Sequence, residues 1–107
     1  MTLEELQHQI STTDSILLYF SGESCGVCQV LKPKIKKAFD DNFPKINQIY
    51  LDAQDNPKIS AHFGIFSLPA IIVYFDGKEF FNKSRLISVD ETIRIIYRPY
   101  SLFLAAS

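Results

Sequence analysis

Two cysteines three residues apart, Cys25 and Cys28, are the side chains most able to do chemistry in this 107-residue chain. They lie between a continuously apolar run, residues 16–20, and a run with apolar residues at helical spacing. A strand, a turn and a helix in this order place the Cys25 sulfur over the first backbone N–H groups of the helix. Those groups and the helix dipole stabilise a thiolate, and Cys28, one turn further on, can close a disulfide. The spacing therefore predicts a two-thiol redox site with an easily ionised Cys25.

Two other uses of a cysteine pair compete with this interpretation. A Cys-x-x-Cys pair can form half of a zinc site, which usually needs a second pair or two histidines. The chain has no further cysteine, and His8 and His62 lack ligand spacing, so zinc within one chain is disfavoured and only a site shared between two chains stays open. Two buried cysteines that act as small hydrophobic residues do not suit a position between a strand and a helix. We expect no metal at the site.

The rest of the chain alternates between helix and strand patterns. Helices are expected over 3–11, from Cys25 to about Asn42, over 57–64, and from residue 88 to Pro99, which should end or kink the last one. Strands are expected over 16–20, 47–51, 70–75 and 78–84, with an Asp-Gly hairpin turn between the last two. An apolar strand, a crossover helix and a second strand form a right-handed parallel unit. The order α-β-α-β-α-β-β-α therefore predicts an α/β fold, an open mixed four-stranded sheet with helices on both faces.

The composition limits the domain number and the kinds of partner that the chain is expected to have. With 47% hydrophobic residues, residues 1–107 can bury the core of a single domain. The net charge of −1, from 11 basic and 12 acidic residues, gives no reason to expect nucleic acid or an anionic membrane as a partner. The acidic start does not look like a signal peptide, and no run approaches the ~18 apolar residues of a membrane span. We therefore expect a cytoplasmic protein, in which a Cys-x-x-Cys pair is more plausibly catalytic than structural. A signal peptide already removed from the sequence would change that expectation.

The motifs and their order resemble the thioredoxin family over residues 3–98. The segments that carry the resemblance are Ser24-Cys25-Gly26-Val27-Cys28, Pro33, Asp55-Asn56-Pro57, Gly64-Ile65-Phe66-Ser67-Leu68-Pro69 and Asp76-Gly77. The resemblance implies a thioredoxin-like fold in which Cys25 is the attacking thiol and Cys28 the resolving one. It also implies that Ser24, Gly26 and Val27 border the substrate. Pro69 matches the family's cis-proline, and Leu68 before it would offer backbone hydrogen bonds to an extended substrate.

The chain departs from the family pattern at its cysteine motif and beneath it. Thioredoxin reads Trp-Cys-Gly-Pro-Cys, whereas Ser24 and Val27 stand here for the tryptophan and the proline. The family's buried aspartate and its lysine partner are replaced by Tyr19 and Tyr50, which are neutral at pH 7. Without the buried negative charge the thiols should ionise more easily.

Two charged residues near the motif bear on the mechanism. Cys28 must lose a proton to resolve a mixed disulfide, and Tyr19 is a poor base. Glu23 is a candidate replacement, although a solvated loop carboxylate is its plainer interpretation. A family glycine in the loop that faces the site aligns near Arg85, which would place a cation by the substrate groove.

These features predict a thiol-disulfide oxidoreductase, most specifically a cytoplasmic protein disulfide reductase. Its Cys25–Cys28 disulfide would serve in place of a cofactor, its substrates would be disulfide-containing proteins, and a thiol reductase or glutathione would donate electrons. We expect a monomer or weak dimer with no nucleic acid or membrane partner. The alternative is a thioredoxin-fold binding module or chaperone with little redox activity. The tyrosine in place of the family's buried aspartate favours it, as do the absence of tryptophan from the chain and the apolar stretches Phe80-Phe81 and 102–104.

Overall fold

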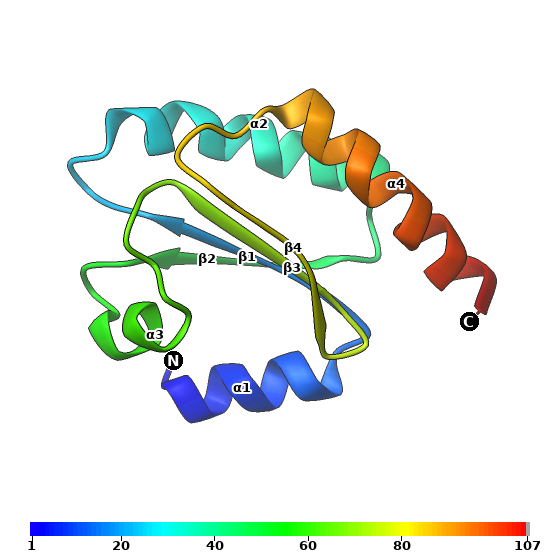
Figure 1. Ribbon diagram of the computed structural model, residues 1–107, viewed down its shortest axis with the longest axis horizontal. Coiled ribbons are helices and arrows are strands. Elements are labelled where there is room, and N and C mark those ends of the chain that lie inside the picture. Colours follow the sequence, from blue (N-terminus) through cyan, green and yellow to red (C-terminus); the bar gives the residue numbers. More distant parts are fainter. Residues whose placement is uncertain (107) are drawn as a thin grey trace.

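The computed structural model describes residues 1–106 and arranges them as a sheet between two layers of helices (Figure 1). The strands are β1 (Ser15–Ser21), β2 (Asn47–Asp52), β3 (Ala70–Phe75) and β4 (Lys78–Ser84), and they form one sheet in the order β2-β1-β3-β4. β1 and β2 are parallel, whereas β3 is antiparallel to both β1 and β4. The predicted element order and the open mixed four-stranded sheet are confirmed within these residues.

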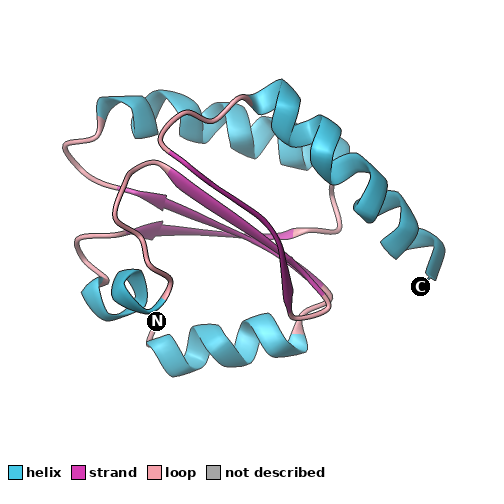
Figure 2. Cartoon of the chain, in the orientation of Figure 1, coloured by secondary structure: helices cyan, strands magenta, loops and turns pink. Residues whose placement is uncertain are grey.

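Helices cover both faces of the sheet. α2 (Gly26–Asn42) and α4 (Val89–Ala106) lie on one face, and α1 (Leu3–Thr12) and α3 (Pro57–His62) lie on the other (Figure 2). Because successive side chains of a strand point to opposite faces, the apolar run of β1 supplies both layers of the core. Leu17 and Tyr19 pack under α2 and α4, while Ile16, Leu18 and Phe20 pack against α1 and α3.

The register of the sheet gathers several connections at one end. Phe20 at the end of β1 pairs with Ala70 at the start of β3, and Ala70 also pairs with Ser84 at the end of β4. Ser21 pairs with Asp52 at the end of β2. The segments that follow β1, β2 and β4 and the segment that precedes β3 therefore meet at this end. The β3–β4 hairpin lies at the other end.

The last helix is longer than the sequence predicted. Pro99 lies inside α4, which continues to Ala106. Of the two predicted effects of the proline, to end or to kink the helix, the first is therefore wrong. A helix-interior proline loses one hydrogen bond, but here tertiary contacts hold the following turn in place. The Tyr100 hydroxyl accepts a hydrogen bond from the Lys45 N–H at 3.1 Å, and the Phe103 ring lies 5.8 Å from that of Phe75. No helix in the described part of the chain has the length and apolar character to span a membrane.

Candidate active site

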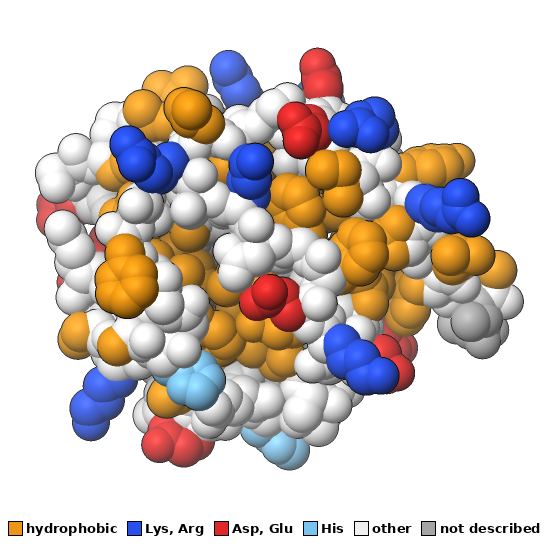
Figure 3. All heavy atoms as spheres, viewed as in Figure 1, with side chains coloured by type: hydrophobic (Ala, Val, Ile, Leu, Met, Phe, Trp, Pro, Cys, Tyr) orange, Lys and Arg blue, Asp and Glu red, His pale blue; other side chains and the backbone are white. Residues whose placement is uncertain are grey.

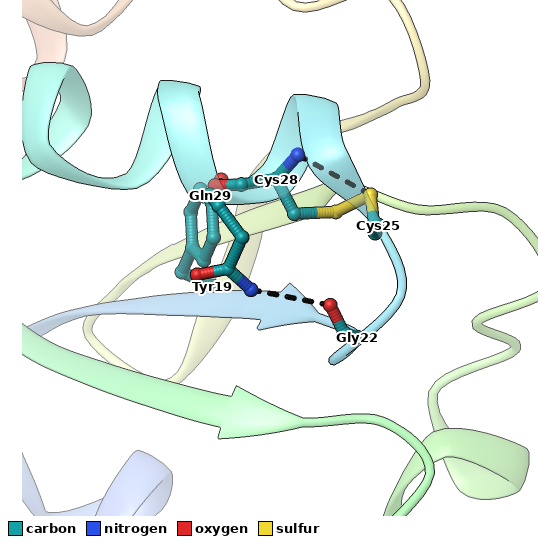
Figure 4. The surroundings of a disulfide bond; sticks show 5 residues. All are labelled: Tyr19, Gly22, Cys25, Cys28 and Gln29. Atoms are coloured by element: carbon teal, nitrogen blue, oxygen red, sulfur yellow. Dashed lines mark hydrogen bonds between the residues drawn. A yellow bond between two sulfur atoms is a disulfide. The ribbon is translucent and has the colours of Figure 1, made fainter.

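Cys25 and Cys28 form a disulfide at the first turn of α2 (Figure 4). Cys25 is the N-cap residue, and its Sγ accepts a hydrogen bond from the Cys28 N–H at 3.2 Å. Cys25 is partly exposed, whereas Cys28 is fully buried. The two sulfurs are therefore inequivalent, because only Cys25 combines solvent access with the positive end of the helix.

Gly22 fixes the loop that carries Cys25. Its carbonyl accepts a hydrogen bond from the Cys25 N–H at 3.1 Å. It also accepts one from the side-chain amide of Gln29 at 3.2 Å (Figure 4). A Cβ on this glycine would lie 2.9 Å from Leu68 Cδ1 and 3.9 Å from the Cys25 Cβ. Any larger residue would push the Leu68 side chain aside, so the glycine allows the segment before β3 to approach the cysteine loop.

The residues expected to border a substrate lie around Cys25. Ser24, Gly26 and Val27 are exposed, and Val27 lines a mainly apolar hollow of about 570 Å³ along the first turns of α2. The Leu68–Pro69 peptide bond is cis, as the resemblance implied. Phe66, which the sequence did not single out for this role, has 92% of its surface exposed two residues before Leu68. The site therefore presents an apolar surface next to an accessible sulfur.

Tyr19 lies fully buried beneath the cysteine turn. Its hydroxyl donates a hydrogen bond of 2.9 Å to the backbone carbonyl of Cys28, and its ring lies 5.5 Å from the ring of Tyr50. Burial raises the pKa of Tyr19 to about 12, so the phenol keeps its proton at neutral pH. The prediction of a neutral group at this position agrees with the structure. Its contact with the Cys28 backbone could not be read from the sequence.

Tyr50 and Glu23 line a polar pocket of about 310 Å³ beside the cysteine loop, at the β2 edge. Burial is the largest cause that raises the pKa of Tyr50 to about 12, followed by the negative charge of Asp40. The Lys32 ammonium lies 5.3 Å above the Tyr50 ring. Glu23 is exposed, and its role as the base for the buried Cys28 stays a prediction.

Arg85 immediately follows β4 and is exposed. Its backbone N–H donates a hydrogen bond of 2.8 Å to the carbonyl of Pro69, which places it at the same end of the sheet as Cys25. Its φ of 69° lies in the region that favours glycine, in agreement with the glycine that the family alignment implies there.

Comparison with known proteins identifies the family. The thioredoxin family model matches residues 1–95. The chain belongs to the thioredoxin family. It is 27% identical to the thioredoxin-like protein YdfQ of Bacillus subtilis over 97 residues, which cover 91% of this chain and 81% of that protein. It is 31% identical to a thioredoxin of Chlamydia muridarum over 81 residues, which cover 76% of this chain and 78% of the relative.

Solved thioredoxin structures share the fold. Thioredoxin 1 of Thermosipho africanus superposes with a TM-score of 0.74 at 26% identity, over 81% of this chain and 96% of that one. A point mutant of a thioredoxin from Halobacterium salinarum gives a TM-score of 0.76 at 22% identity, over 91% of this chain and 83% of that one. The chain thus has a thioredoxin-like fold and is a thioredoxin-family oxidoreductase with a Cys-x-x-Cys disulfide.

In this thioredoxin-family site, the reduced Cys25 thiol should have a pKa below the ~8.5 of a free cysteine. The hydrogen bond from the Cys28 N–H stabilises its thiolate, and the first turn of α2 contains no acidic residue to oppose it. The rate of alkylation against pH, measured on Cys28→Ala so that only Cys25 reacts, gives the value directly. A midpoint no lower than that of a free cysteine would contradict the prediction.

Proposed function

We propose that this protein is a cytoplasmic protein disulfide reductase in which Cys25 attacks the substrate and Cys28 releases it. The observation that carries the proposal is the asymmetry of the pair. Cys25 is partly exposed and lies at a helix N-terminus, while Cys28 is buried and joined to it by the disulfide. An attacking thiol needs access and a low pKa, whereas a resolving thiol only has to reach the first sulfur.

The reaction takes place in two exchanges. The Cys25 thiolate attacks one sulfur of a substrate disulfide, the substrate S–S bond breaks, and the departing substrate thiolate takes up a proton. Cys28 then loses its proton to water and attacks Cys25 Sγ. The mixed disulfide breaks and the second substrate thiolate is protonated. Two electrons and two protons pass to the substrate, and the Cys25–Cys28 disulfide remains.

The exposed residues around Cys25 would bind the substrate. Val27 and Phe66 offer apolar contact. The Leu68 side chain lies against Gly22 of the cysteine loop, and an extended substrate chain would pair with the Leu68 backbone. A thiol reductase or two glutathione molecules would return the enzyme to the dithiol form, with no cofactor besides its own disulfide. The names of the related thioredoxins support this direction of electron flow.

The reduction potential of the Cys25–Cys28 pair, measured against a glutathione series, tests the proposed direction. A value near thioredoxin's ~−270 mV supports a reductase under cytosolic conditions. A value near ~−180 mV or above would contradict it, because such a pair would oxidise or isomerise disulfides instead.

A binding function is the second candidate, because a large apolar hollow lies far from the cysteines. It has a volume of about 590 Å³ at the β3–β4 hairpin end, and it is lined by Asp14, Phe75, Asp76, Phe80, Pro99, Leu102 and Phe103. Suppression of aggregation of an unfolded protein by the Cys25→Ala, Cys28→Ala double variant would favour this function. No suppression would leave the reductase proposal as the better account.

A further inference from the structure

Arg85 lies at the end of the sheet where a substrate would meet Cys25. β4 ends at Ser84, which pairs with Ala70, and Ala70 pairs with Phe20 at the end of the strand that leads to the cysteines. The Arg85 N–H donates a hydrogen bond to the carbonyl of Pro69, the residue that follows Leu68. The Leu68 side chain and Cys25 in turn flank Gly22. Arg85 is thus connected to the cysteine loop through the segment that would pair with a substrate.

The backbone of Arg85 is unfavourable for a residue with a side chain. Its φ is 69°, and the Leu86 N–H donates a hydrogen bond of 3.0 Å to the Ser84 carbonyl, so Arg85 is the central residue of a three-residue turn. A turn of this kind with positive φ is rare and strained, and it costs a non-glycine residue about 1 kcal/mol or more relative to glycine. Strain of this kind at a site is a reason to look for a role for the side chain.

The charge of Arg85 is available to a partner. The ion pairs of the described residues join Lys36 to Asp40 and Lys37 to Asp41. Arg85 is exposed and takes part in neither of them. The next residue, Leu86, has 87% of its surface exposed. Figure 3 shows hydrophobic side chains exposed across one face of the molecule, with Lys and Arg side chains between them.

Charges of opposite sign lie at the two edges of this end of the sheet. Arg85 follows β4, one edge strand. The polar pocket beside β2, the other edge strand, is lined by three acidic residues, Glu23, Asp52 and Asp55, and by one cation, Lys32. A substrate segment that crosses from one edge to the other over Cys25 would meet a cation first and carboxylates last. An acidic residue on the β4 side of the substrate would be attracted, and one on the β2 side would be repelled.

We propose that Arg85 makes the site selective for disulfides that carry an acidic residue beside the cysteine, on the side that faces β4. This inference rests on the proposed reductase function and narrows its substrates. Arg85 acts here through charge on the substrate and takes no part in the exchange of the disulfide. The turn fixes the backbone of Arg85 against the Pro69 carbonyl, next to the segment that would pair with the substrate.

Peptide disulfides that differ in one residue test the inference. Each carries a fluorophore and a quencher across the disulfide and has Glu or Gln next to the attacked cysteine, either before or after it. The reduced protein should react about threefold to fivefold faster with Glu than with Gln in one of the two positions, as expected for an exposed ion pair. The ratio should fall towards one as the salt concentration rises, because salt screens exposed charges.

Four variants separate charge from backbone effects. Arg85→Gln should lose the preference, and Arg85→Lys should retain most of it because the cation remains. Arg85→Gly should lose the preference while it gains stability against urea, since the strain is relieved. Lys78→Gln, the matched control, removes the same charge at the far end of β4 and should leave the preference unchanged.

The outcomes separate a failure of the Arg85 inference from a failure of the proposed reductase function on which it rests. Equal rates for Glu and Gln peptides in the wild-type protein, or a preference that survives in Arg85→Gln, would overturn the role of Arg85 and leave the reductase function standing. If the reduced protein reacts with none of the peptides, the proposed function fails, and the inference with it.

Discussion

Cys28→Ala should hold the enzyme as a one-to-one mixed disulfide with its substrate. Cys25 keeps its position at the N-terminus of α2, so the first exchange proceeds, but no second thiol is present to break the bond that it forms. Alanine is preferred to serine at this fully buried position, because an unpaired hydroxyl would cost about 1–3 kcal/mol of stability. The adduct is detected by mass spectrometry after one turnover without added glutathione.

Cys25→Ala is the matched control for that experiment. It removes the attacking thiol, so the rate of disulfide reduction should fall by at least ~1000-fold, the scale of loss when a covalent nucleophile is deleted. No adduct should form, because Cys28 is shielded from solvent. Rapid turnover by Cys28→Ala without any adduct, or an adduct on Cys28 in the Cys25→Ala variant, would reverse or remove the assigned roles.

Tyr19→Asp should lower the free energy of unfolding by about 4 kcal/mol, a large share of the 5–15 kcal/mol typical of a domain. The change removes a fully buried ring from the core under α2 and leaves the Cys28 carbonyl without the Tyr19 hydroxyl. It also places a carboxyl group in apolar surroundings, which raises the pKa of that group. The folded state then holds a proton that the unfolded state releases, so the loss should be smaller at pH 4 than at pH 7.

Urea melts at the two pH values measure this prediction, with Tyr19→Phe as the control. The phenylalanine retains the ring and loses only the hydroxyl, so it should cost about 1 kcal/mol at either pH. Because Tyr50 is the neighbour of Tyr19 in the β1–β2 register, adding Tyr50→Lys to Tyr19→Asp should recover part of the loss through an ion pair. Equal stabilities of Tyr19→Asp and Tyr19→Phe at pH 7 would show that the position tolerates a charge.

The same variants test how Cys28 loses its proton. If an acidic residue at this position accepts that proton, stopped-flow release of the substrate thiol should be faster in Tyr19→Asp than in the wild type at pH 7. Tyr19 itself cannot accept it, since its phenol stays protonated with a pKa of about 12. An unchanged rate of the second exchange, both in Tyr19→Asp and in Tyr19→Asp with Tyr50→Lys, would indicate that water alone deprotonates Cys28.

The sequence by itself determined the features that depend on neighbouring residues. The apolar run of β1, the Cys-x-x-Cys turn and the amphipathic start of α2 follow from hydrophobic periodicity, and the Asp76-Gly77 hairpin follows from two residues that adopt positive φ. The order of these elements predicted the observed mixed four-stranded sheet. It also predicted the end of the sheet at which the cysteines lie. The resemblance to the thioredoxin family pointed to Pro69 and Arg85, which no local pattern would have placed at the same end of the sheet as the cysteines.

Only the tertiary structure decided the contacts between segments far apart in the chain. The Tyr19 hydroxyl donates a hydrogen bond to the Cys28 carbonyl. Gly22, which lacks a side chain, leaves room for the Leu68 side chain. The Arg85 N–H donates a hydrogen bond to the Pro69 carbonyl. The extension of α4 beyond Pro99 has the same origin. Each of these depends on strand register and on the packing of helices against the sheet, and a local propensity such as that of a proline to end a helix yields where packing opposes it.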